Sequence, residues 1–196
     1  MGRIFARLDE DLIDWIGKQH MFFVATAPSG DGGHVNVSPK GGSNLFQVTG
    51  SHGFAYVDLM GSGIETIAHL RENGRIVVMF AAFDGPPKIL RLHGRGSVTQ
   101  QRDEAFEARL AAFDVSEEQL RAVRSVISVE VTRISDSCGF VVPRMVYEEE
   151  RDQLYRYADN RIRKRGPDAV REYVTAKNAE SLDGLTGLDP LVPARS

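Results

Sequence analysis

The chain has 196 residues, with 24 basic and 27 acidic side chains, and this even balance leaves no basic excess for binding nucleic acid. Its one cysteine, Cys138, excludes an intrachain disulfide and a metal site made of several cysteines. The longest strongly apolar run, residues 76–83, is too short to span a membrane, and the charged amino-terminal stretch lacks the apolar region of a signal peptide. We therefore expect a soluble, cytoplasmic protein.

The first part of the chain predicts one short helix followed by two β-hairpins. Residues 9–18 begin with acidic side chains and place Leu12, Ile13 and Ile16 on one face, as an amphipathic helix does. After this helix, β-prone runs alternate with clusters of glycine, proline, aspartate and serine, which is typical of hairpins. These runs are residues 21–27, 34–39, 44–49 and 53–59.

The middle of the chain predicts a second helix and then further strands. The helix is expected from about residue 63 to residue 73, where Asn73 and Gly74 supply a C-cap. Another helical stretch is expected from about residue 102 to residue 123. The strands of this region are predicted at residues 75–83, 88–98 and 125–134.

The strand pattern predicts the fold class. Six or seven short strands, broken by one early helix and joined by connections too short for parallel crossovers, favour an antiparallel barrel or sandwich. The class is therefore mainly β with peripheral helices (α+β). We expect a single domain over residues 1–196, with the barrel at about 15–134 and a C-terminal helical extension at about 147–180.

The predicted extension is rich in charge. Residues 148–165 and 168–179 predict two polar helices, which are expected to lie over the barrel or across a subunit boundary. The basic run 161–165 falls in the last turn of the first helix, where cations stabilise the negative end of the helix dipole. We therefore interpret this run as helix-stabilising rather than as a nucleic-acid site.

Two glycine-containing segments have the composition of an anion-binding loop. Residues 38–42 (SPKGG) join a hydroxyl group and a cation to two glycines, which let backbone amides approach a ligand. Residues 61–63 (GSG) precede a helix, whose free N–H groups and dipole favour a phosphate. Taken alone, the first segment is better interpreted as a hairpin turn and the second as a helix entry.

The order of these segments resembles the pyridoxamine 5'-phosphate oxidase-like family, whose members are FMN-binding split barrels. The most similar pieces are IAHLRENGRIVVMF (67–80) and ILRLHGRGSV (89–98). The resemblance covers roughly residues 15–134 and continues more weakly to residue 178. It implies an antiparallel split β-barrel, a homodimer with the cofactor at the interface, and an FMN-dependent oxidoreductase that acts on a small molecule.

The resemblance also implies which residues contact the flavin. The family's flavin-contacting strand ends in a lysine, which matches Lys40, and a second strand carries an arginine, which matches Arg91. The strand before Lys40 would follow the isoalloxazine ring and the ribityl chain, and the start of the early helix would approach the phosphate. The implied cofactor-binding residues are Val35, Asn36, Val37, Ser38, Lys40, Ser62, Gly63, Thr66 and Arg91.

Two departures from the family pattern bear on the cofactor and the substrate. The family grips the FMN phosphate with a Ser-Arg-Lys motif, where this chain has Ile64-Glu65-Thr66. A glutamate cannot replace an arginine as a phosphate ligand, so Ser62, Thr66, Lys40 and the helix start would share that task. The family's arginine-rich segments for pyridoxamine phosphate are absent, so this compound is not the expected substrate. The alternatives are a non-catalytic flavin- or haem-binding module and an enzyme that uses a deazaflavin.

The remaining reactive side chains predict no further site. The five histidines lack the spacing of a metal-binding pair, so no metal site is expected. His69 is expected to be a partly exposed residue of the early helix. Cys138 is expected to be a small buried cysteine.

Overall fold

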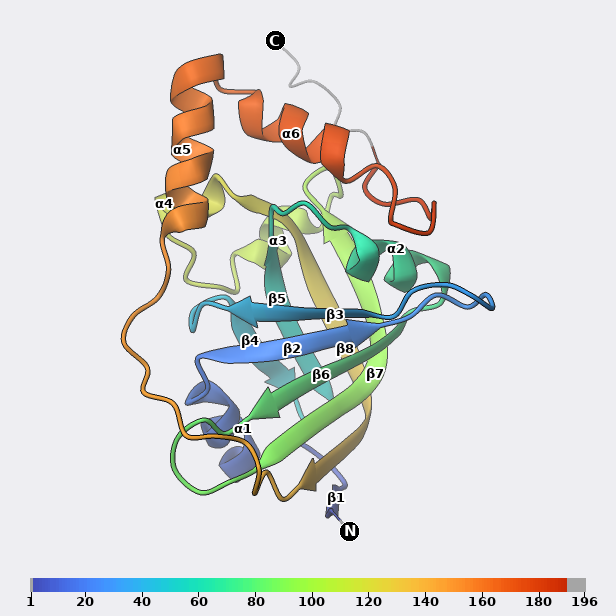
Figure 1. Ribbon diagram of the computed structural model, residues 1–196, viewed down its shortest axis with the longest axis vertical. Helices are drawn as coiled ribbons and strands as arrows, with labels where there is room; N and C mark the ends of the chain where they lie inside the picture. Colours follow the sequence, from blue (N-terminus) through green and yellow to red (C-terminus); the bar gives the residue numbers. More distant parts are fainter. Residues whose placement is uncertain (1, 190–196) are drawn as a thin grey trace.

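An antiparallel sheet of eight strands curls into a barrel that stays open along one side (Figure 1). The computed structural model describes residues 2–189. Seven strands follow one another in the order β3-β2-β6-β7-β8-β5-β4, and β1 pairs with β8 beside this path. The strands are β1 (Ile4–Phe5), β2 (Met21–Thr26), β3 (Asn36–Gly41), β4 (Phe46–Gly50), β5 (Gly53–Leu59), β6 (Arg75–Ala81), β7 (Ile89–Gln100) and β8 (Val123–Ser137).

The topology confirms the predicted mainly β class with a split barrel. The strand pairs are antiparallel throughout the described residues, and β3 and β4 end the path without pairing to each other. The two longest strands, β7 and β8, pair along their length and carry a β-bulge between His93 and Gly94. At this bulge a Cβ atom on Gly94 would lie 2.2 Å from the Glu130 carbonyl oxygen, so the close approach of the strands requires glycine.

Aromatic side chains fill the inside of the barrel. Phe22, Phe54, Tyr56 and Phe80 are almost wholly buried, and Phe46 joins them from β4. Neighbouring rings in this group have centroids 5.2–6.4 Å apart, which is the usual range for aromatic pairs. They reach the core because alternate side chains of each strand point inward.

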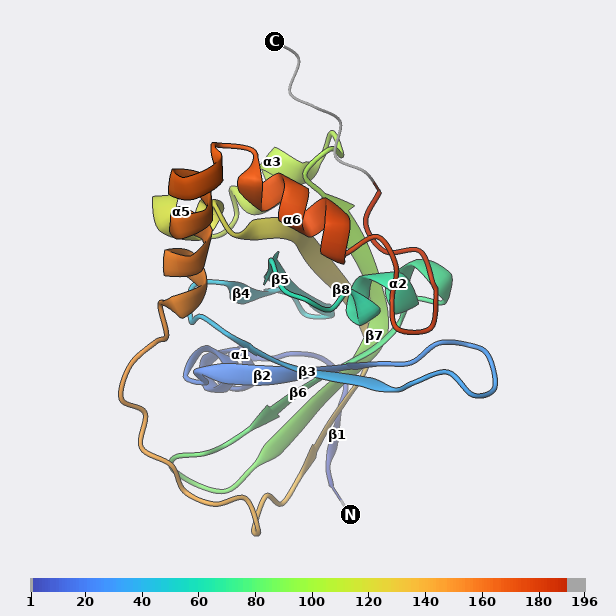
Figure 2. The ribbon, with the colours of Figure 1, turned by 45° about the horizontal axis from the view of Figure 1, so that its top comes forward.

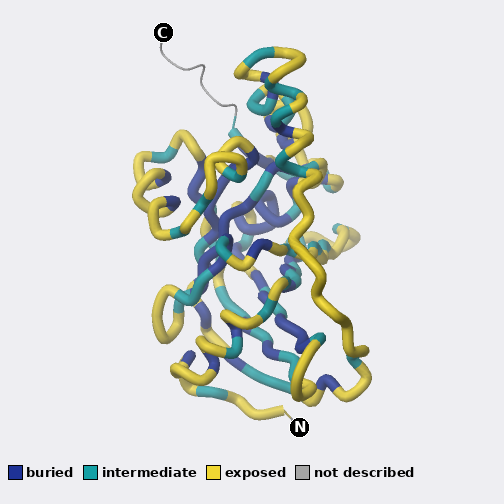
Figure 3. The backbone as a smooth tube through the Cα atoms, turned by 90° about the vertical axis from the view of Figure 1, so that its left-hand side faces the viewer, coloured by how far each residue is buried: buried dark blue, intermediate teal, exposed yellow. Residues whose placement is uncertain are grey.

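Six helices surround the sheet. Helix α1 lies near one end of the barrel, and α5 and α6 stand over the other end, as Figures 1 and 2 show. The connection before α5 is exposed throughout residues 143–152 (Figure 3). None of the helices within residues 2–189 is long and apolar enough to cross a membrane. The helices are α1 (Glu10–Gly17), α2 (Glu65–Glu72), α3 (Phe106–Leu110), α4 (Glu117–Leu120), α5 (Gln153–Arg165) and α6 (Ala169–Lys177).

The single helix predicted for residues 102–123 is wrong, because two short helices, α3 and α4, occupy this region. Ser116 starts the second one. Its hydroxyl group accepts a hydrogen bond from Gln119 N at 3.2 Å, and the Gln119 side chain accepts one from Ser116 N at 2.9 Å. This capping box begins a new helix axis and lets the chain turn from β7 back into β8.

One predicted strand has different bounds in the structure, and one observed strand was not predicted. The strand predicted at residues 34–39 is β3, which begins two residues later and runs through Pro39 to Gly41. Proline is tolerated there because β3 is an edge strand, paired only with β2 within the described residues. Strand β1 was not predicted at all, since its two residues, Ile4 and Phe5, are too few to show an alternating pattern.

Candidate functional site

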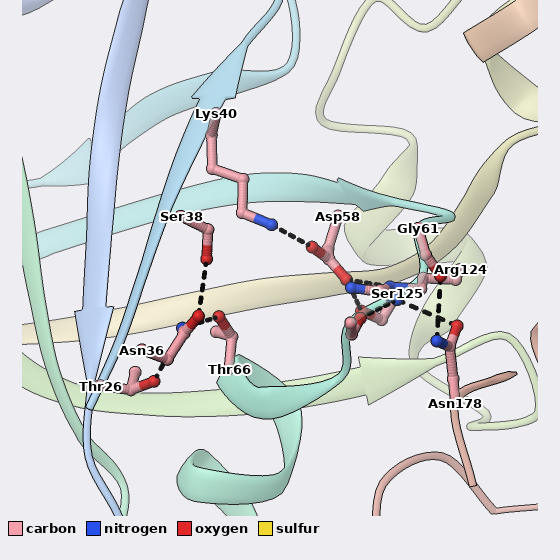
Figure 4. A network of polar contacts seen from close by, with 11 residues as sticks. Thr26, Asn36, Ser38, Lys40, Asp58, Gly61, Thr66, Arg124, Ser125 and Asn178 are labelled. Atoms are coloured by element: carbon pink, nitrogen blue, oxygen red, sulfur yellow. Dashed lines mark hydrogen bonds and ion pairs between the residues drawn. The ribbon is translucent and has the colours of Figure 1, made fainter. Parts of the chain in front are cut away.

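A cavity of about 410 Å³ opens where β3 faces the start of α2. Because side chains alternate along a strand, β3 turns Asn36, Ser38 and Lys40 toward the cavity and Val37 away from it. Figure 4 shows the polar side chains of this region and the contacts between them. The other polar and glycine residues of the wall are Gly41 at the end of β3, Gly61, Gly63, Glu65 and Thr66 before and within α2, and Arg124 from β8.

Five of the nine predicted cofactor-binding residues line this cavity. They are Asn36, Ser38, Lys40, Gly63 and Thr66. The side chains of Val35 and Val37 lie outside it and are 71% and 61% exposed. Ser62 is exposed at the start of the helix, and Arg91 lies on β7, where it donates to Ser137 Oγ at 3.0 Å. The role of all nine residues toward a flavin stays a prediction.

A buried carboxylate, Asp58, joins the two cations of the cavity wall. Its Oδ1 accepts a hydrogen bond from Lys40 Nζ at 3.0 Å, and its Oδ2 accepts one from Arg124 Nε at 2.5 Å (Figure 4). Burial raises the pKa of this carboxyl group, but the charges of Arg124 and Lys40 outweigh burial and lower the pKa of Asp58 to about 2. Asp58 therefore stays ionised and holds both cations in place.

Arg124 is held by further acceptors behind the cavity. Its Nη1 donates to the Gly63 carbonyl oxygen at 2.8 Å and to Asn178 Oδ1 at 3.0 Å. Asn178, directly after α6, is wholly buried, and its Nδ2 donates to the Gly61 carbonyl oxygen at 3.0 Å. The guanidinium group of Arg124 is thus fixed on several sides while it still forms part of the cavity wall.

Sequence reasoning missed three of these residues. Asp58 ends an apolar strand run and Arg124 precedes another, and a charged side chain beside such runs is a usable signal of a buried ion pair. Asn178 carries no such signal, because it lies 54 residues beyond Arg124 and no local pattern connects the two.

A second network orients the polar groups on the β3 side. Asn36 Nδ2 donates to Thr66 Oγ1 at 3.0 Å and to Thr26 Oγ1 at 3.2 Å, while Asn36 Oδ1 accepts from Ser38 Oγ at 3.3 Å (Figure 4). The Asn36 amide is therefore held by three hydroxyl groups, from β2, β3 and α2. Since Thr66 accepts from Asn36, the hydroxyl proton of Thr66 is free to be donated to a ligand in the cavity.

Two expectations about single residues are wrong. His69 is wholly buried rather than partly exposed, because α2 presses this face against the sheet, where Nδ1 lies 3.0 Å from Thr26 Oγ1. Burial lowers the pKa of His69, although the carboxylates of Asp183, Glu65 and Glu72 act in the opposite direction. Cys138 is exposed rather than buried, since it follows the last residue of β8, where the sheet ends.

The wall of the cavity suits an anion rich in oxygen atoms. Lys40 and Arg124 supply two positive charges, and Thr66 supplies a hydroxyl donor. The first N–H groups of α2 add to them, since they have no acceptor within the helix and Ile64 caps it without a side-chain bond. Two carboxylates oppose these groups: Asp58, which pairs with both cations, and Glu65, whose Oε1 accepts from Leu182 N at 3.3 Å.

The described residues offer no comparable site for a metal ion. Within residues 2–189, no three histidine, cysteine, aspartate or glutamate side chains gather in a group able to hold one. The cavity beside β3 and α2 is therefore the candidate functional site.

Comparison with solved structures finds similar chains of low sequence identity. An FAD-binding protein from Mesorhizobium loti is 12% identical with a TM-score of 0.46, covering 69% of this chain and 95% of that chain. An FMN-binding protein from Syntrophomonas wolfei is 17% identical with a TM-score of 0.46, covering 63% of this chain and 80% of that chain.

Comparison of sequences gives much stronger similarity. The model of the pyridoxamine 5'-phosphate oxidase family matches residues 8–138, which include the cavity residues of β3, α2 and β8. The pyridoxamine 5'-phosphate oxidase family protein ustO of Aspergillus flavus is 38% identical over 201 residues, which cover 96% of this chain and 78% of the relative. The match extends across the barrel and most of the remaining chain, so this protein belongs to the pyridoxamine 5'-phosphate oxidase family.

Proposed function

We propose that the protein binds FMN at this cavity and acts as a flavin-dependent oxidoreductase on a small molecule. The observation that carries the proposal is the convergence of Lys40 and Arg124 on one buried carboxylate at the edge of a cavity able to hold part of a ligand. Two fixed cations and the amino end of a helix form a site for a phosphate group. All lining residues of the cavity except Leu154 lie within residues 8–138, which match the family model.

The residues of the wall have separate tasks in this proposal. Lys40 and Arg124 neutralise the phosphate, and Thr66 donates a hydrogen bond to it. Asp58 holds the two cations in a fixed position. Asn36 and Ser38 give the β3 side a fixed pattern of polar groups. The bound flavin supplies the hydride or electron transfer, and the protein binds and orients it.

The substrate in this proposal is a small molecule other than pyridoxamine phosphate, because the arginine-rich segments that recognise that compound are absent from the sequence. A non-catalytic flavin-binding module is the second candidate. It is favoured by the composition of the wall, since the described lining of the cavity contains no histidine, the side chain best suited to proton transfer near neutral pH.

A homodimer is part of the same proposal. β3 is an edge strand beside the cavity, and its outward apolar side chain Val37 and the neighbouring Val35 are exposed. Exposed apolar side chains on an open sheet edge need a cover, which a second copy of the chain would supply. A cytoplasmic location also belongs to the proposal, since a reducing compartment keeps the exposed Cys138 as a thiol.

An absorption spectrum of the purified protein and a titration with FMN test the cofactor. We expect paired near-ultraviolet and blue bands, release of FMN on heating, and FMN affinity weakened about tenfold or more in Lys40→Ala, since a charged hydrogen bond is lost. Lys164→Ala, which alters an exposed lysine of α5, is the control and should bind as the unchanged protein does. A protein that stays colourless with added FMN would exclude the proposal.

Reduction of the bound flavin separates the two candidate functions. Under anaerobic conditions, rapid bleaching of the blue band by NADH or NADPH supports an oxidoreductase. A flavin that is bound but is reduced by neither donor supports the non-catalytic module. A sharp Soret band in place of flavin bands would identify the ligand as haem.

A further inference from the structure

The segment after α6 is attached to both sides of the cavity. We call residues 178–189 the C-terminal strap. Figure 2 shows it passing beside α2, and Leu182 N donates to the Glu65 carboxylate at 3.3 Å. Asp183 binds the opposite hairpin, where it accepts from His34 N at 2.8 Å and from His34 Nδ1 at 2.6 Å. The strap therefore connects α2 to the loop that precedes β3.

Asn178 begins the strap and is its point of contact with the cavity. The side chain is wholly buried, and it uses both ends of its amide: Oδ1 accepts from Arg124 Nη1 and Nδ2 donates to the Gly61 carbonyl oxygen. Gly61 and Arg124 both line the cavity, whereas Asn178 stands behind them (Figure 4). The amide thus bridges two segments of the wall, and it adds to the direct bond from Arg124 Nη1 to the Gly63 carbonyl oxygen.

The rest of the strap is held by bonds that do not use this amide. Leu188 N donates to the Asn178 backbone oxygen at 2.8 Å, and Gly187 N donates to the Ala179 oxygen at 2.7 Å. Asp189 N donates to Gln100 Oε1 at 3.1 Å. Shortening the Asn178 side chain therefore leaves the main-chain bonds of the strap in place, so its effect on the cavity can be measured separately.

We propose that Asn178 is a positioning residue, which holds Gly61 and Arg124 in place and so couples docking of the C-terminal strap to ligand binding in the cavity. The ligand side of this inference rests on the proposed FMN site. Coupling of two sites is reciprocal, so a ligand held by Arg124 must stabilise the docked strap to the same degree as the docked strap stabilises the ligand.

The test compares Asn178→Ala with Ser181→Ala. Both residues are buried in the strap, but Ser181 binds only inside the strap, where its Oγ accepts from Leu185 N at 3.1 Å. Hydrogen exchange of the ligand-free proteins is measured first. We expect faster exchange at residues 61–66 in Asn178→Ala and unchanged exchange there in Ser181→Ala. If Asn178→Ala does not fold, Asn178→Ser takes its place.

Binding of FMN and of riboflavin, which lacks the phosphate, is measured next. In Asn178→Ala we expect FMN affinity to fall about tenfold, the usual effect of losing a hydrogen bond to a charged group, while riboflavin affinity stays the same. In the unchanged protein and in Ser181→Ala, FMN should slow exchange of the Gly187 and Leu188 amides. In Asn178→Ala this protection should be lost.

Each result has a defined meaning. Equal exchange at residues 61–66 in both variants would overturn the positioning role. Equal losses of FMN and riboflavin affinity would overturn it too, because a general loosening of the fold does not distinguish the phosphate. If the unchanged protein binds no FMN, the proposed function fails, and the ligand-free exchange still decides the role of Asn178.

Discussion

Asp58 shows how one buried side chain sets the charge of the cavity. It bonds both Lys40 and Arg124 and is wholly buried, so its removal leaves two cations without their counter-charge. Breaking a buried ion pair from one side costs about 3–5 kcal/mol. We expect Asp58→Asn to lower the free energy of unfolding by about 3 kcal/mol at pH 7, measured by urea unfolding. Asp84→Asn, at an exposed position, is the control and should change stability little.

The pH dependence of stability tests the same residue. The folded-state pKa of Asp58 is about 2, below its ordinary value of 3.8. A carboxyl group with a lowered folded-state pKa stabilises the fold above its ordinary pKa, and this contribution is lost as the pH falls toward the folded-state pKa. The shift corresponds to about 2 kcal/mol. The stability difference between the unchanged protein and Asp58→Asn should therefore narrow from pH 4 to pH 2. A constant difference would contradict the assignment.

Some residues of the cavity region could be predicted from the sequence and others could not, and the difference has a physical reason. The family pattern pointed to Lys40 and Thr66, since each lies in a local motif that can be read along the chain. Asp58 and Arg124 meet because β5 and β8 pair with Asp58 opposite Ser125. No local sequence motif determines which residues of two strands pair. The network that joins these residues could therefore be found only in the structure.

At the scale of elements, prediction succeeded where the pattern was local. The helix expected at residues 63–73 is α2, Glu65–Glu72, because the apolar face and the stop at Asn73 both lie in the same short segment. The prediction of a single helix at residues 102–123 failed because helix-forming residues continue on both sides of Ser116. The capping box at Ser116 nevertheless starts a new helix, α4, with its own axis. A cap outweighs the weak propensities of the residues on either side.

The bulge between β7 and β8 yields a prediction at this scale. A methyl group on Gly94 would meet the Glu130 carbonyl oxygen at 2.2 Å, so Gly94→Ala must push β7 and β8 apart. We expect the free energy of unfolding to fall by about 1–3 kcal/mol or more, the cost of overpacking. Gly30→Ala, with no atom near the added group, is the control. Equal thermal unfolding of the two variants would show that the strands can yield at the bulge.

The whole molecule depends on contacts between distant parts of the chain. The polar helices α5 and α6 were expected to lie over the barrel or across a subunit boundary. Ala158 and Val174 pack into the main core of the same chain. The C-terminal strap returns to α2 through Leu182 and to the loop before β3 through Asp183. These contacts join residues that are far apart in the sequence, so no local sequence pattern predicts them.

The open edge of the barrel gives a prediction for the assembly. Val37 faces outward from edge strand β3 and is 61% exposed, so Val37→Glu should not disturb the fold of a single chain. In the proposed homodimer the same change places a charge, and its symmetric copy, in an apolar contact. Light scattering should give twice 21.7 kDa for the unchanged protein and one chain for Val37→Glu.

Leu120→Glu, which alters an exposed side chain of α4, is the matched control for this change and should remain a dimer. Circular dichroism of both variants establishes that the fold is retained. A single-chain mass for the unchanged protein would exclude the homodimer. A dimer that survives Val37→Glu would move the interface away from β3, and the cavity would then have to bind its ligand without residues from a second copy at this edge.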